Sequence, residues 1–438
     1  MQRIVINQLG PLTHCELSVN DFIICTGPQA SGKSTLAKSI FFFKNLRNIL
    51  QKQFRKRIIL AGNVESKTGM GSFQNEFFKE IRLNFLQIFG SSWCMNPEMY
   101  LKYYYDEESF IQISLKSGKG TPNYIWIECS DDFKKLFKEL NKMQEEHFEH
   151  FGAVEDLVDR KLKEIFHEDK EIIYIPAGRS MISLFSSQLY YLYSFMDDAQ
   201  KRNLDYCTQN YLERILQMKE VFTKSPEQMI EDAFILMGSK ADKAFFDELL
   251  QLEHNILQGE YVNVNGEERL VVENDKYIKI NFASSGQQEV LWILNVLFYY
   301  IINDRKAYFI IEEPESYLFP EAQKKITEFI SMVRRNGENQ ILITTHSPYI
   351  LGTINNLLYA DKISKVVDYD KLEQIIPHRR WLPFSAVAAY FIRGGSVDSC
   401  LDKEFQSIEN EVIDDAAEMI NNDYDKMVYL KEACSKGE

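Results

Sequence analysis

The chain has 438 residues, of which 45% are hydrophobic and 13% aromatic, so it can bury a large core and form two or three domains. Its net charge of −14 argues against indiscriminate nucleic-acid binding over the whole surface. No run of about 18 apolar residues occurs and the N-terminus lacks a signal-peptide pattern, which predicts a cytoplasmic protein without a membrane span. The seven scattered cysteines predict reduced thiols and neither a disulfide framework nor a zinc site.

Three strands are predicted at the start of the chain, over 3–8, 15–19 and 21–26, and the third leads into a stretch that fits G-x-x-x-x-G-K-[ST]. Its glycines let backbone N–H groups turn toward a phosphate, and the helix that follows adds a positive dipole end. We expect Lys33 to reach the β- and γ-phosphates of ATP and the Ser34 hydroxyl to bind Mg²⁺. The expected ATP-binding residues are Gly27, Pro28, Gln29, Ala30, Ser31, Gly32, Lys33, Ser34 and Thr35.

The helix after this loop is basic. Residues 41–64 contain six basic side chains and no acidic one. A surface formed by Lys44, Lys52, Arg55 and Lys56 is a candidate nucleic-acid contact, and a solvated basic face is the alternative. Residues 57–61 are consistent with a further short strand.

The middle of the chain alternates between strands and helices. A helix is predicted over 77–89, a hairpin over 110–129, and a helical segment over 131–167 that Gly152 interrupts. A strand at 171–175 ends at Pro176, and several helices follow up to about 254. An aromatic cluster in these helices is either core or a contact for another protein: Tyr190, Tyr191, Tyr193 and Phe195. Residues 260–282 return to strands.

A second set of polar residues follows. Ser284, Ser285, Gly286 and Gln287 open an apolar helix, and the next apolar run ends in the paired acids Glu312 and Glu313. Glu312 is suited to hold Mg²⁺, and Glu313 to polarise an attacking water. A further strand, 340–344, leads to His346, a candidate γ-phosphate contact, because ligands of α/β sheets bind at the carboxyl ends of strands. Each feature alone also fits a solvated strand end, a structural histidine or a helix cap, but their order after the phosphate-binding loop favours the functional interpretation.

This order of motifs resembles the ABC/SMC-type ATPases, most closely their RecF- and OLD-like bacterial branch, over residues 1–130 and 255–395. The resemblance identifies residues 27–34 as Walker A, residues 283–287 as the signature, Glu312 as the Walker B acid, Glu313 as the catalytic glutamate and His346 as the H-loop switch. It implies an α/β fold: an ABC-type head with a mixed P-loop core sheet, an antiparallel β-subdomain and a helical insertion.

The resemblance also predicts the domain boundaries. Residues 1–130 and 254–398 would form the head and 131–253 the helical insertion. Residues 399–438 would form an acidic helical tail, since residues 398–438 hold twelve acids and four lysines, a balance of −8, with apolar positions such as Ile408 at helical spacing.

Three positions depart from the family pattern. Glu312 replaces the usual aspartate, Ser285 replaces the first glycine of the signature, and Pro-Ala-Gly-Arg-Ser stands where a glutamine-containing loop would follow the strand at 171–175. Arg179 is a candidate phosphate sensor in that loop, and a helix-capping arginine is the alternative. These departures predict slow or conditional hydrolysis.

The family architecture implies further partners. The signature of one subunit closes over the ATP of another, so the resemblance predicts a homo-oligomer, a dimer or larger, with ATP and Mg²⁺ as cofactors. ATPase subunits of antiphage systems of the Septu, PARIS or retron-associated types look similar, which predicts that the chain regulates a separate effector, a nuclease or toxin. The alternative is an ATPase of DNA repair or chromosome maintenance. A transporter subunit is least favoured because the helical segment is large and aromatic.

Overall fold

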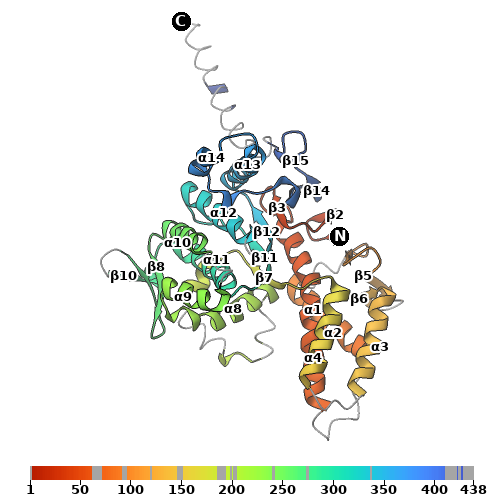
Figure 1. The fold of residues 1–438 in the computed structure, drawn as a ribbon. Helices are drawn as coiled ribbons and strands as arrows, with labels where there is room; N and C mark the ends of the chain where they lie inside the picture. Colours follow the sequence, from red (N-terminus) through yellow and green to blue (C-terminus); the bar gives the residue numbers. More distant parts are fainter. Residues whose placement is uncertain are drawn as a thin grey trace.

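Figure 1 shows the computed structural model of the chain, in which helices pack around a central sheet. None of the described helices combines the length and the apolar character needed to cross a membrane. The structure describes residues 2–61, 72–90, 96–118, 121–145, 151–184, 194–197, 200, 205–238, 242–272, 276–335, 338–409, 422 and 426–427.

The core sheet has six strands in the order β14-β13-β3-β12-β11-β7. Five of them run parallel, and β14 pairs antiparallel with β13. The carboxyl ends of β3, β11 and β12 therefore meet at one edge, where open α/β sheets bind their ligands. The six strands are β3 (Phe22–Thr26), β7 (Glu171–Ile175), β11 (Ala307–Glu312), β12 (Gln340–Thr345), β13 (Val387–Arg393) and β14 (Ser396–Ser399).

The core sheet separates two hydrophobic cores, because side chains alternate between the two faces of a strand. In β3, Phe22 and Ile24 pack in one core, whereas Ile23 and Cys25 pack in the other. Every residue of β3 and β11 is buried. Strands covered on both faces are continuously apolar, which is why these two were recognisable in the sequence.

One core is shared with an antiparallel sheet of order β2-β1-β4-β5-β6. Helices α1 to α4 pack together beside this sheet (Figure 1). The strands are β1 (Arg3–Leu9), β2 (Leu12–Ser18), β4 (Tyr100–Tyr104), β5 (Phe110–Gly118) and β6 (Thr121–Cys129). The helices are α1 (Lys33–Ala61), α2 (Phe73–Phe89), α3 (Asp131–Glu145) and α4 (Phe151–Phe166).

The other core contains α11 (Ser285–Ile302), an apolar helix that is buried almost throughout. A capping box between Ser284 and Gln287 fixes its first turn. The same core contains side chains from α8 (Tyr206–Met218), α9 (Pro226–Met237), α10 (Lys243–Leu257), α12 (Pro320–Arg335) and α13 (Pro348–Ile363). A small antiparallel sheet lies beside them, made of β8 (Glu260–Val264), β9 (Glu267–Val271) and β10 (Tyr277–Lys279).

Short elements complete the described chain. They are α5 (Ser180–Leu184), α14 (Tyr369–Ile375), β15 (Leu401–Asp402), β16 (Ser407–Ile408) and four 3₁₀ turns, at Val221–Thr223, Ile280–Phe282, His378–Arg380 and Phe384–Ala386.

The expected mixed α/β class is confirmed, but three local predictions were wrong. Residues 57–61 continue α1, where Arg57 forms an ion pair with Glu76 of α2. β7 lies inside the predicted helical insertion and pairs with β11, so that segment contributes to the core sheet. Ile408 belongs to β16, where backbone pairing with Leu401 replaces the expected helix. Most of the remaining tail and the cluster at Tyr190, Tyr191 and Tyr193 lie outside the described residues, and Phe195 is exposed.

Candidate functional site

The loop between β3 and α1 adopts the backbone that its glycines permit. Gly27 has φ +144°, and a Cβ there would lie 2.2 Å from the Ile392 carbonyl oxygen of β13. Gly32 has φ +113°, and a Cβ there would lie 2.7 Å from Leu12 Cδ2. Only residues without a side chain fit these positions, so the strand–loop–helix geometry expected of a phosphate-binding loop is present.

Lys33, the first residue of α1, turns its side chain back to this loop and has only 5% of its surface exposed. Its Nζ donates to the carbonyls of Gly27 at 2.9 Å and Pro28 at 2.8 Å, and lies 3.4 Å from His346 Nδ1. Burial lowers the pKa of Lys33, and the Glu313 carboxylate opposes that shift. The ammonium is therefore held where the loop and the neighbouring strand ends converge.

An acid and a histidine, Glu313 and His346, reach this point directly after β11 and β12. The parallel register pairs Glu312 with Thr344, so the residues that follow these strands lie side by side. His346 Nε2 lies 3.3 Å from Glu313 Oε1, and its Nδ1 faces Lys33. The side chains expected to act on the γ-phosphate and on water are thus linked in one chain of contacts.

Buried Glu315 positions the histidine. Its Oε1 accepts hydrogen bonds from Thr345 Oγ1 and from the backbone N–H of His346, both at 2.7 Å. Burial raises the pKa of Glu315, while these two hydrogen bonds lower it. The sequence analysis assigned no role to Glu315, because its partners lie 30 and 31 residues further along the chain.

Glu312 has the features of a metal ligand. It is 5% exposed, and its Oε2 accepts a hydrogen bond from the Ala177 N–H at 3.2 Å. Its Oε1 is buried and has no hydrogen-bond partner among the described residues. The same described part of the chain contains no cluster of three metal-ligating side chains. This pattern fits Mg²⁺, which proteins bind through one or two carboxylates together with substrate phosphates. Glu312 and the Ser34 hydroxyl are the residues that would hold it.

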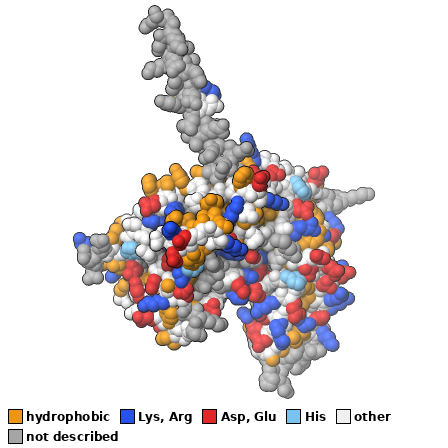
Figure 2. Space-filling view, turned by 45° about the horizontal axis from the view of Figure 1, so that its top comes forward, with side chains coloured by type: hydrophobic (Ala, Val, Ile, Leu, Met, Phe, Trp, Pro, Cys, Tyr) orange, Lys and Arg blue, Asp and Glu red, His pale blue; other side chains and the backbone are white. Residues whose placement is uncertain are grey.

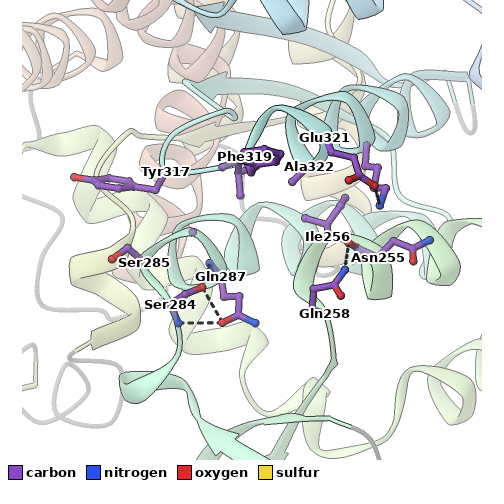
Figure 3. A pocket seen from close by; sticks show the side chains of 13 residues that line it. Asn255, Ile256, Gln258, Ser284, Ser285, Gln287, Tyr317, Phe319, Glu321 and Ala322 are labelled. Atoms are coloured by element: carbon purple, nitrogen blue, oxygen red, sulfur yellow. Dashed lines mark hydrogen bonds and ion pairs between the residues drawn. The ribbon is translucent and has the colours of Figure 1, made fainter.

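The signature residues line a separate pocket of about 540 Å³ at the start of α11 (Figure 3). Ser284 Oγ caps the helix by accepting from the Gln287 N–H, and Gln287 Nε2 donates to Leu257 O at 2.7 Å. A Cβ on Gly286 would lie 2.7 Å from the Tyr317 carbonyl oxygen. Tyr317 and Phe319, on the opposite side of the pocket in Figure 3, are 73% and 77% exposed.

A comparison with protein families identifies the family to which the chain belongs. The model described as "AAA ATPase domain" matches residues 1–351, which include the phosphate-binding loop, the paired acids and His346. The chain belongs to the AAA ATPase domain family. The expected P-loop ATPase type is therefore confirmed, whereas the resemblance to antiphage subunits stays a prediction. No curated protein matches the chain.

Three solved structures that match the chain each cover 91% of it. The SMC head domain from Thermotoga maritima matches over 97% of its own length with 9% identity and a TM-score of 0.35. An SmcHead bound to the C-winged helix domain of ScpA matches over 95% with 9% identity and a TM-score of 0.37. The recombination mediator protein RecF matches over 97% with 11% identity and a TM-score of 0.31.

Within the ATPase domain, Arg179 does not have the predicted role of a phosphate sensor. Its side chain is fully buried, and its guanidinium donates to the backbone carbonyls of Pro176, Glu312, Glu313 and Glu289. The remaining contact is an ion pair with the Glu289 carboxylate at 3.4 Å. With its donors occupied by protein, the arginine is not available to a phosphate.

Only some of the basic side chains predicted to form a nucleic-acid contact on α1 are exposed. Lys44 is buried and forms an ion pair with Glu168, because the helix packs its middle against the 167–170 loop. Arg55 is exposed and pairs with Glu155 of α4, while Lys52 and Lys56 are exposed. Acidic and basic side chains are interspersed over the face shown in Figure 2. Lys44 is therefore removed from the candidate contact.

Proposed function

We propose that this protein hydrolyses ATP to ADP and phosphate with Mg²⁺, with Glu313 as the residue that activates water. The observation that carries the proposal is the chain of contacts from Lys33 through His346 to Glu313, at the joined carboxyl ends of β3, β11 and β12. Phosphoryl transfer needs positioned cations and an oriented water more than covalent chemistry, and these side chains supply both.

Each residue has one task in this scheme. Lys33 and the backbone N–H groups of residues 29–34 bind the phosphates of the substrate. The Glu313 carboxylate is the proton acceptor. His346 orients it, because His346 Nε2 lies 3.3 Å from Glu313 Oε1. Glu312 and Ser34 are the side chains for Mg²⁺, which, when bound, neutralises charge on the phosphate oxygens.

Two variants test hydrolysis directly. Removing the loop's ammonium in Lys33→Ala should abolish both ATP binding and turnover, whereas Glu313→Gln should retain binding and lose about 10²–10⁴-fold in kcat. ATP affinity is measured with a fluorescent ATP analogue and turnover by phosphate release. Lys79→Ala, an exposed lysine on α2, is the matched control. Undiminished ATP affinity in Lys33→Ala, or parental kcat in Glu313→Gln, contradicts the assignment.

We further propose that the signature pocket completes the ATP site of a second copy of the chain. The first turn of α11 offers backbone N–H groups, which suit a phosphate, and exposed aromatic side chains flank it: Phe282, Tyr317 and Phe319. Mixing Lys33→Ala chains with Ser284→Arg chains should then restore activity, because one site of each mixed dimer combines an intact loop with an intact signature. A monomer with bound ATP and no rescue on mixing contradicts this model.

The biological task we propose is control of a separate effector, a nuclease or toxin, in antiphage defence within the cytoplasm. Support for a protein partner comes from exposed apolar side chains around α13 and α14, namely Tyr359, Val366, Ile375 and Phe405. Co-purification with the products of neighbouring genes tests this proposal. An adjacent nuclease or toxin that binds and responds to ATP is the expected result, and recombination proteins in its place would favour the repair alternative.

Nucleic-acid binding is proposed only through Lys52, Arg55 and Lys56. Phosphate contacts make affinity fall steeply as salt rises. DNA and RNA titrations at two salt concentrations, with the parental protein and the alanine triple variant, test the contact. Unchanged affinity in the triple variant removes it.

A further inference from the structure

The loop between β7 and α5 contacts both acids of the site. The Ala177 N–H donates to Glu312 Oε2 at 3.2 Å. Arg179, two residues later, donates through Nη1 to the Glu312 carbonyl at 2.6 Å and through Nη2 to the Glu313 carbonyl at 2.9 Å. One short loop therefore fixes the backbone that carries the metal ligand and the proton acceptor.

Glu313 needs such support because of its backbone conformation. Its φ is +42°, in the left-handed region that residues other than glycine usually avoid. Conformations of this kind persist only where surrounding contacts over-determine them. The Glu313 N–H donates to the Thr344 carbonyl at 2.9 Å, and its own carbonyl accepts from Arg179 and from the Ser316 N–H at 3.1 Å. These contacts turn the Glu313 side chain toward His346.

Glu289 of α11 holds the arginine in turn. Its carboxylate accepts from the backbone N–H groups of Arg179 at 2.9 Å and Ser180 at 2.6 Å, and its carbonyl accepts from Arg179 Nε at 3.0 Å. Both side chains are almost completely buried. Burying an ion pair is costly compared with apolar packing, so stability alone is a weak explanation for its presence. The Arg179–Glu289 ion pair instead connects the end of β11 to α11, the helix that begins at the signature residues.

We propose that Arg179 is a positioning residue for hydrolysis: with Glu289, it holds Glu313 in the left-handed conformation that directs its carboxylate at the reaction site. The inference rests on the proposed role of Glu313 as the residue that activates water. Because Lys33 and the phosphate-binding loop make none of these contacts, losing Arg179 should impair turnover and leave ATP binding intact.

The test compares Arg179→Lys with Arg214→Lys, a partly buried arginine that pairs with Glu171 at the other end of β7. Lysine keeps the charge but cannot reach several carbonyls from one planar group. Misplacing a catalytic group costs about 10²-fold in rate, so we expect that loss of kcat with an unchanged KM and ATP affinity. Arg214→Lys should retain parental kcat, and circular dichroism and thermal melting verify folding of both variants.

A double variant separates positioning from general structural support. If Arg179 acts through Glu313, Arg179→Lys adds little to the loss already present in Glu313→Gln, because residues that act as a unit are non-additive. Losses that multiply, or a kcat of Arg179→Lys equal to the parental value, overturn the inference alone. Should Arg179→Lys fail to fold, Glu289→Gln replaces it, with the same kcat-specific loss expected and an unchanged kcat as the contrary result. A parental protein without Mg²⁺-dependent ATP hydrolysis overturns the proposed function itself.

Discussion

The loop after β3 and the loop after β7 leave the same edge of one sheet and serve the same site, but they depend on the chain in different ways. In the first, residues 27–34, the loop's own carbonyls of Gly27 and Pro28 hold Lys33 Nζ, and its approach to His346 follows from that local geometry. The second, residues 176–180, acts through residues more than 100 positions away, Glu289 and the Glu312–Glu313 pair. A local motif can be recognised in a sequence, whereas a loop of the second kind needs the fold.

That difference explains what could be predicted. Residues 27–34, Glu313 and His346 were expected to lie together because each follows a continuous apolar strand, and Glu312 ends one. The parallel pairing of these strands brings their ends together. The hairpin at 110–129 and the helix cap at Ser284 were likewise local signals.

The remaining assignments depended on tertiary contacts. Lys44 was misplaced on the surface because nothing in its helix reveals that Glu168 lies opposite, and Arg179 was misassigned because its acceptors are backbone carbonyls, which carry no sequence signal. A faint signal existed for Glu289, the one acid among the apolar residues of α11.

The largest expected effect comes from Gly27→Ala in the first loop. Its φ of +144° costs about 1–3 kcal/mol with a side chain present, and the Cβ would also lie 2.2 Å from a backbone oxygen. We expect loss of measurable ATP binding, determined with a fluorescent ATP analogue. Parental affinity in this variant would contradict the role of the local backbone.

Glu315→Ala should have the next largest effect, because Glu315 positions His346, which contacts both Lys33 and Glu313. Removing the carboxylate leaves Thr345 Oγ1 and the His346 N–H without their acceptor, which costs about 1–3 kcal/mol of unfolding free energy. Turnover should fall more than ATP affinity. Urea unfolding and phosphate release measure the two effects, with Glu80→Ala, an exposed acid of α2, as the control. Equal behaviour of the two variants would show that Glu315 is not needed.

Gly178→Ala in the second loop should be milder than Gly27→Ala. Its φ is +74°, but no described atom lies within 4 Å of the added Cβ. Only the left-handed backbone penalty of about 1–2 kcal/mol remains. We expect a lower melting temperature with ATP affinity unchanged. A loss of ATP binding as large as that of Gly27→Ala would end the distinction between the two loops.

The smallest effect on activity is expected at Glu253 of α10, a buried carboxylate outside both loops. Burial, with the nearby Glu260 and Glu227 carboxylates, raises the pKa of Glu253 from 4.5 to about 8. Between these values the folded state binds more protons than the unfolded state, so this group lowers the free energy of unfolding as pH rises, by up to about 1.4 kcal/mol per pH unit. Below pH 4.5 and above pH 8 both states carry the same charge at this group, and its contribution to the slope disappears.

Glu253→Gln keeps the shape of the side chain and removes its titration. Relative to the parental protein, the variant should therefore be more stable at pH 8 than at pH 5, because at pH 8 it avoids burying a charge. Urea unfolding at the two pH values measures this difference, and phosphate release at pH 8 should show parental kcat and KM. An identical pH dependence of unfolding in both proteins would remove the titrating role of Glu253. A fall in kcat would show instead that hydrolysis also depends on a buried group outside the two loops. That result would contradict the assignment of the site to these two loops.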